Sequence, residues 1–135
     1  AFHPLRLEEV LGLKWADIDI DAGIIHVRRA VTHPDRNRPE VKDTKTAASV
    51  RDIGLSTIAL PQLIPGKPDE FVCGGSNPLS YTQVRRMNDR IGKQLEFDGA
   101  ITPRRFRTTV LTYMTAQKIL SWPSQQPDIL RLPCA

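Results

Sequence analysis

The stretch PLRLEEVLGLKWADID, residues 4–19, decides how the fold begins. Leu7, Val10 and Leu11 recur at helical spacing, and two consecutive glutamates stand early, where the helix dipole favours acidic side chains. This pattern predicts a helix over residues 5–14.

Three strand-like segments follow this helix. After an Asp-Ala-Gly turn at residues 21–23, the run IIHVRRAV at 24–31 is rich in β-branched residues and predicts a strand. Residues 40–42 and 50–55 predict two more strands, joined by the turn DTKTAAS at 43–49. We therefore expect these segments to form a three-stranded antiparallel sheet.

Two longer helices are predicted in the second half of the chain. Ser80 and Gln83 match a capping box at the start of the first. The apolar residues that line one face of that helix are Val84, Met87, Ile91 and Leu95. Thr102 is the expected N-cap of the second helix, and Pro103 suits its first turn. Its expected buried stripe is Phe106, Val110 and Tyr113. No internal repeats are present, and the predicted class is α+β, mainly helical with a small three-stranded antiparallel sheet.

Composition excludes some classes of protein. The chain of 135 residues has a formal net charge of +4, and thirteen of its 19 basic residues are arginine, which binds phosphate with a bidentate fork. Charge alone leaves nucleic-acid binding open. Two cysteines form no disulfide framework and fit a reducing cytoplasm, and no apolar run approaches the roughly 18–20 residues of a membrane span. We expect a cytoplasmic protein, and because the first residue is alanine, a fragment or a processed chain.

The opening stretch also contains a specific motif. Arg6 is followed by Glu9 and then by the pattern Leu-x-Trp-x-Asp-Ile-Asp at residues 13–19. This resembles the first conserved box of the tyrosine recombinase, or phage integrase, catalytic domain. Pro4 stands where that family has glycine.

Two further segments extend the resemblance in the family's order, up to about residue 112. Lys45, in TKTAASVRDI, matches the family's hairpin lysine. Thr102, Pro103 and Arg107, in ITPRRFRTT, match its Thr-Pro-His-x-x-Arg box. The resemblance implies an integrase-like catalytic domain with helices around the small sheet.

The resemblance implies a chemistry for these residues. Family members attack a DNA phosphodiester with a tyrosine, and two arginines hold the non-bridging oxygens of the transition state. Arg6 and Arg107 are the candidates for that pair, and Lys45 is the candidate proton donor to the leaving 5′-oxygen. The resemblance also implies that Glu9 orients Arg6. Arg104 occupies the usual histidine position, where it keeps a donor but cannot act as a base at neutral pH.

Each candidate also has a plain structural reading. A lysine at a hairpin tip is commonly just solvated, and Arg6 beside Glu9 is an ordinary i,i+3 helix pair. Arg85 and Arg86 belong to a basic helix that could face DNA or solvent. Arginines at positions 104, 105 and 107 oppose the dipole at a helix start, which favours a phosphate there. We therefore take Arg105, with Arg85 and Arg86, as candidate DNA-binding residues.

The family's third box is missing. No Gly-His pair follows Arg107, and no nucleophilic tyrosine is identifiable, because Tyr81 precedes the second box and Tyr113 lies too close after it. We expect a partial recombinase domain over residues 1–112 and an atypical tail over 113–135. A shift of reading frame near Thr112 is one hypothesis, because codons allowed by the tail can encode a helical peptide that ends in Gly-His. A genuinely divergent tail is the alternative.

These observations lead to three expectations of function. The first is a DNA-binding fragment of a site-specific tyrosine recombinase, inactive in DNA integration or excision as it stands. The second is a non-catalytic DNA-binding protein that occupies recombination sites. The third is an enzyme that borrows a tyrosine from a neighbouring subunit. The implied partners are double-stranded DNA and other recombinase subunits, with no membrane and no small-molecule substrate. No metal or nucleotide cofactor is implied, since arginines and a lysine take the role of a metal.

Overall fold

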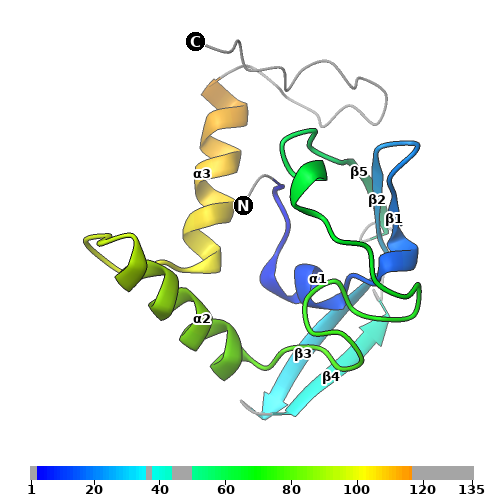
Figure 1. The fold of residues 1–135 in the computed structure, drawn as a ribbon. Helices are drawn as coiled ribbons and strands as arrows, with labels where there is room; N and C mark the ends of the chain where they lie inside the picture. The colour runs from blue at the N-terminus through cyan, green and yellow to red at the C-terminus, as the bar shows by residue number, and fades with distance from the viewer. Residues whose placement is uncertain (1–2, 36–37, 44–49, 117–135) are drawn as a thin grey trace.

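The computed structural model describes residues 3–35, 38–43 and 50–116. This part of the chain contains three α-helices, five strands and two short 3₁₀ helices (Figure 1). The elements in chain order are α1 (Leu7–Gly12), η1 (Trp15–Asp17), β1 (Ile18–Asp19), β2 (Ile24–Val27), β3 (Arg29–Asp35), β4 (Arg38–Asp43), β5 (Arg51–Gly54), η3 (Leu60–Gln62), α2 (Tyr81–Gln94) and α3 (Pro103–Ala116). The α+β class predicted from the sequence is therefore confirmed, but the description as mainly helical holds only in part, because strands also make up a substantial share of the described residues.

The strands form two antiparallel sheets. One has the order β1-β2-β5, and the other is the hairpin β3-β4. In the first sheet Ile25 pairs with Ile53, and in the second Val31 pairs with Val41. The turn before β2 is as predicted: Gly23 has a φ of 66°, and Asp19 accepts a hydrogen bond from the Ala22 N–H at 2.8 Å.

The predicted three-stranded sheet was wrong in its membership. The run 24–31 is not one strand, because it divides at Arg28 into β2 and β3, which belong to different sheets. The predicted strand at 40–42 lies within β4 and pairs with β3 rather than with β5. Apolar residues alternate at Ile25 and Val27, the pattern is interrupted by Arg29, and it resumes at Val31. Ile25 and Val27 are buried in one core and Val31 is buried in another.

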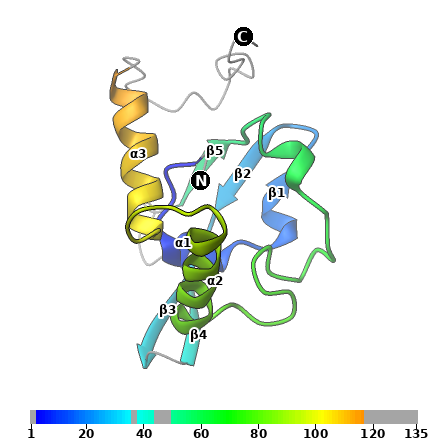
Figure 2. The ribbon, with the colours of Figure 1, turned by 60° about the vertical axis from the view of Figure 1, so that its left-hand side comes forward.

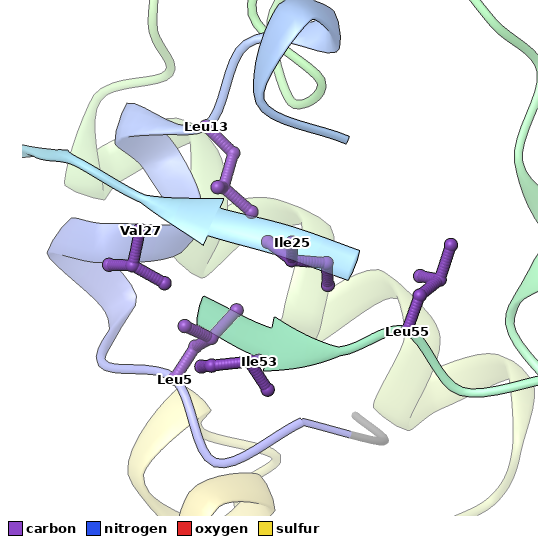
Figure 3. Close-up of a cluster of buried hydrophobic side chains, with 6 residues drawn as sticks. All are labelled: Leu5, Leu13, Ile25, Val27, Ile53 and Leu55. Carbon is purple, nitrogen blue, oxygen red and sulfur yellow. The ribbon is translucent and has the colours of Figure 1, made fainter. Parts of the chain in front are cut away.

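The larger core joins the first sheet to the segment around α1. Figure 3 shows its buried side chains gathered around β2 and β5, with Leu5 and Leu13 reaching in from the segments before and after α1. They are Leu5, Leu13, Ile25, Val27, Ile53 and Leu55. This core fixes residues 5 and 13, which flank α1, and so holds the helix start in place.

The smaller core joins three elements from distant parts of the chain. Leu11 of α1, Val31 of β3 and Val84 of α2 are buried together. Gly12 allows α1 to approach β3 closely, because a Cβ built at this position would lie 2.8 Å from the backbone oxygen of Arg29. The helix is shorter than the 5–14 predicted, since Leu13 has already left the helical conformation with ψ at 132°.

The caps of the two longer helices are as predicted. Ser80 Oγ accepts from the Gln83 N–H at 3.3 Å, and the Gln83 side chain accepts from the Ser80 N–H at 2.8 Å. Thr102 Oγ1 accepts from the Arg105 N–H at 3.3 Å at the start of α3. In both ribbon views α3 stands apart from the strands, with its first turn beside the start of α1 (Figures 1 and 2).

The apolar faces of these helices differ from expectation. Of the stripe predicted on α2, only Val84 is buried, and Met87, Ile91 and Leu95 are exposed. On α3 the predicted buried stripe was wrong: Phe106 is 39% exposed and Tyr113 is 46% exposed, whereas Met114 is buried. Sequence periodicity identifies an apolar face, but burial also needs a partner surface, and among the described residues most of these side chains stay exposed. In the described residues, no helix has the length and apolar character to cross a membrane.

Candidate phosphate-binding site

The first turns of α1 and α3 enclose an open pocket of about 480 Å³. Three of the arginines singled out in the sequence line it: Arg6, Arg104 and Arg107. They come from segments about a hundred residues apart, so the fold, not local sequence, brings them together. The other lining residues are Leu5, Leu7, Glu8, Thr102, Pro103 and Thr108. Because three arginines are among the residues that line this open pocket, the site is suited to an oxyanion such as phosphate.

The start of α3 supplies two of the arginines for local reasons. Thr102 caps the helix and Pro103 opens its first turn, so Arg104 and Arg107 fall one turn apart on the same side. Arg104 is exposed and Arg107 half-buried. The unpaired N–H groups of a helix start also favour an anion, which adds to the arginine charge at this end of α3.

Arg6 is held at the start of α1 by Glu9. The Glu9 side chain accepts a hydrogen bond from the Arg6 backbone N–H at 2.8 Å, while the Arg6 guanidinium lies 3.5 Å from the same carboxylate. The Arg6 side chain is 62% exposed and that of Glu9 only 6%. Glu9 therefore contacts Arg6, and its shorter hydrogen bond is to the Arg6 backbone N–H rather than to the guanidinium.

Arg51 is the main charged partner of Glu9. Its two terminal nitrogens donate to Glu9 Oε1 at 2.9 Å and to Oε2 at 2.8 Å. Burial alone would raise the pKa of Glu9, but the hydrogen bonds from Arg51 and from the Arg6 backbone hold the pKa below its usual value. Glu9 is therefore an ionised carboxylate that joins α1 to β5.

A second carboxylate lies on the rim of the pocket. Glu8 accepts a hydrogen bond from the hydroxyl of Tyr81 at 2.9 Å, and the Tyr81 ring stacks on His33 with centroids 3.8 Å apart. Burial, this hydrogen bond and the charge of Glu8 raise the pKa of Tyr81 to about 12. Tyr81 is thus a neutral donor engaged with Glu8.

Neither tyrosine of the chain lines the arginine pocket. Tyr81 is engaged with Glu8, and Tyr113 lies on α3, beyond the pocket-lining residues of that helix. The pocket can therefore hold a phosphate group, but the described residues bring no tyrosine hydroxyl to it.

The predicted DNA-binding residues of α2 and Arg105 are not among the residues that line the pocket. Lys45 lies outside the described residues. Arg85 is exposed on α2 with Asp89 4.0 Å away, and Arg86 is also exposed. Arg105 donates to the backbone oxygen of Ala100 at 2.9 Å and so braces the loop between α2 and α3.

Sequence reasoning missed Arg51 and Glu8. Arg51 lies 42 residues from Glu9, and no local pattern predicts that pairing. Its signal was only its place at the start of a predicted strand. Glu8 was noted for the helix dipole, and its contact with Tyr81 spans 73 residues.

In the described ranges, no group of three or more His, Cys, Asp or Glu side chains could hold a metal ion. A more apolar groove of about 870 Å³ adjoins the arginine pocket and shares Thr102, Arg104 and Thr108 with it. Its remaining walls come from the α2–α3 loop and the first half of α3.

No family model matches the sequence, and no curated protein matches it. The fold is similar to solved structures of the Tn1549 transposon integrase. The integrase in complex with a circular intermediate DNA superposes with a TM-score of 0.69 and 19% identity, over 90% of this chain and 46% of that chain. The integrase with transposon right end DNA gives a TM-score of 0.64 and 21% identity, over 88% and 46%.

The XerA recombinase is also similar, with a TM-score of 0.55 and 18% identity over 87% of this chain and 41% of that chain. The chain thus spans less than half the length of each of these solved proteins. At these identities the likeness establishes the fold. The part of the chain that the structure describes has the fold of an integrase or recombinase domain segment.

Proposed function

We propose that this chain is a DNA-binding fragment related to site-specific tyrosine recombinases, and that it does not cleave DNA as it stands. The observation that carries the proposal is the pocket lined by Arg6, Arg104 and Arg107 in an integrase-like fold. The structures of the Tn1549 integrase contain DNA, which makes a DNA phosphate the natural occupant to test.

The proposed roles follow from the positions of the side chains. Arg6 and Arg107 hold the non-bridging oxygens of one phosphate, and Arg104 adds positive charge beside them. Glu9 orients Arg6. Lys45 is the proposed proton donor to the leaving 5′-oxygen, a role that would need a nucleophile to be present. Exposed arginines on α2, Arg85 and Arg86, would add phosphate contacts without base recognition.

The position and the pKa of the tyrosines are the reasons for proposing that the chain does not cleave DNA. Neither lines the pocket, and the pKa of Tyr81, raised to about 12 by burial and by Glu8, opposes formation of a phenolate nucleophile. The proposed domain at residues 1–112 and atypical tail at 113–135 agree with this loss. Helix α3 runs from Pro103 to Ala116 and so passes residue 112 without a break. A change of reading frame near Thr112 would therefore have left residues 113–116 helical.

A binding assay with a nicked duplex tests this proposal. We expect DNA binding that weakens steeply as salt rises, because phosphate contacts release counterions. We also expect no covalent protein–DNA adduct on a denaturing gel. Absence of binding at low salt would contradict the proposal, whereas an adduct would support an enzyme that uses a tyrosine from another subunit.

The second candidate function is a non-catalytic DNA-binding protein that occupies recombination sites. In this case the tail is encoded in the original reading frame. The gene distinguishes the two. If a shifted frame beyond the codon for Thr112 encodes a Gly-His box and a tyrosine, the chain derives from a recombinase by frame change. If no frame does, the tail belongs to the protein and the second candidate is favoured.

A further inference from the structure

The carboxylate of Glu9 is shared unequally between two arginines. A carboxylate offers about four acceptor positions. Arg51 takes one on each oxygen, at 2.9 and 2.8 Å, and the Arg6 backbone N–H takes a third at 2.8 Å. The Arg6 guanidinium is left with one long contact of 3.5 Å.

This division has a consequence for the pocket. The Glu9 side chain is 6% exposed, so its charge needs a close partner, and Arg51 provides a bidentate one. Because Arg51 satisfies Glu9, Arg6 keeps a side chain that is 62% exposed and lines the arginine pocket. Without Arg51, the nearest cation to the buried carboxylate would be the Arg6 guanidinium.

We propose that Arg51 is a positioning residue for the arginine pocket: by occupying Glu9, it prevents this carboxylate from capturing Arg6 and keeps the Arg6 guanidinium available to a phosphate. Arg51 does not itself line the pocket. The choice of a phosphate group as the ligand rests on the proposed function. The arrangement of Arg51, Glu9 and Arg6 does not depend on it.

A single and a double variant test this role. In Arg51→Gln, we expect Arg6 to turn onto Glu9, and binding of inorganic phosphate to weaken roughly five- to tenfold. In Arg51→Gln with Glu9→Gln, the capturing charge is gone, and phosphate binding should recover most of that loss. A purely structural role of Arg51 would also let the double variant recover binding, because Glu9→Gln removes the unpaired buried charge, so the rotation of the Arg6 guanidinium decides between the two roles.

The full chain and NMR spectroscopy provide both readouts. Phosphate affinity is taken from the shifts of the arginine side-chain signals during titration. Rotation of the Arg6 guanidinium about its Nε–Cζ bond is measured without ligand, and should slow in Arg51→Gln and return in the double variant. Arg38→Gln is the matched control, because it removes the same charge from an exposed arginine outside the pocket.

Each outcome is informative. Unchanged Arg6 rotation in Arg51→Gln overturns the inference, whatever the phosphate affinity. If the unsubstituted protein binds no phosphate, the proposed function fails, and the rotation measurement still decides the role of Arg51. Should Arg51→Gln fail to fold, Arg51→Lys replaces it, because lysine lacks the planar bidentate fork that arginine places on Glu9 and should give the same changes at smaller magnitude.

Discussion

At Glu9, burial and charge act in opposite directions. Burial raises the pKa of the carboxyl, while the hydrogen bonds from Arg51 and from the Arg6 backbone lower it, and the net pKa lies below the usual 4.5. The folded protein therefore binds this proton more weakly than the unfolded chain does. The stability that Glu9 contributes is complete above about pH 4.5 and is lost as the pH falls through the folded-state pKa.

Replacing Glu9 by glutamine should remove this pH dependence. We expect Glu9→Gln to lower the free energy of unfolding by about 1–3 kcal/mol at neutral pH, because it breaks a buried charged pair. Below about pH 4.5 the difference from the unsubstituted protein should shrink. Urea unfolding followed by circular dichroism across this range measures it, and a constant difference at all pH values would show that Glu9 is not held as the charged form.

Tyr81 allows a spectroscopic test at high pH. Burial, the hydrogen bond to Glu8 and the charge of Glu8 raise its pKa to about 12 from an ordinary 10.0. Since the folded-state pKa is raised, the associated stability is lost as the pH rises from about 10 to 12. Tyr113→Phe leaves Tyr81 as the single tyrosine, so ultraviolet absorption of the phenolate reports it alone.

We expect the absorption midpoint of Tyr113→Phe to lie near 12 while the circular dichroism remains native. Adding Glu8→Gln should move the midpoint only partly toward the ordinary value, because burial of the ring persists. A midpoint near 10 with Glu8 in place would contradict the contact between Tyr81 and Glu8.

At the scale of elements, the contact between α1 and β3 depends on Gly12. A Cβ at this position would lie 2.8 Å from the backbone oxygen of Arg29, which cannot move aside as a flexible side chain could. We expect Gly12→Ala to destabilise the protein by about 1–3 kcal/mol, as overpacking does. Urea unfolding measures the change.

Gly92 of α2 is the matched control. A Cβ there would meet only the Ile101 side chain, at 3.7 Å and beyond, which is ordinary contact. We expect Gly92→Ala to stabilise the protein by about 0.5–1 kcal/mol, because alanine loses less entropy in a helix. Equal effects of the two substitutions would contradict the close approach of α1 to β3.

Elements were predictable where their signals are local. The capping box of Ser80 and Gln83 and the cap at Thr102 depend on residues three apart, and both are confirmed. The exposed positions of Phe106 and Tyr113 were not predictable, since burial depends on what packs against the helix. Apolar periodicity describes a face but not its partner.

At the scale of the whole molecule, strand pairing was the weakest part of the sequence prediction. β2 pairs with β5, and β3–β4 forms its own hairpin between them in the chain. Short strands carry little information on which neighbour they choose, and the division at Arg28 depends on two separate cores. The arginines that line one pocket were predicted as a set from the family resemblance, whereas the Glu9–Arg51 pair required the folded chain.

The measurement that tests the central claim is the affinity for a short DNA duplex of two double variants with the same net charge. Arg6→Gln with Arg107→Gln removes two charges from the pocket, and Arg38→Gln with Lys67→Gln removes two exposed charges elsewhere. We expect the pocket variant to lose roughly tenfold or more in affinity, and the control variant to lose less than about threefold. Equal losses in the two variants would show that DNA binding follows overall charge, and would contradict a phosphate site in the arginine pocket.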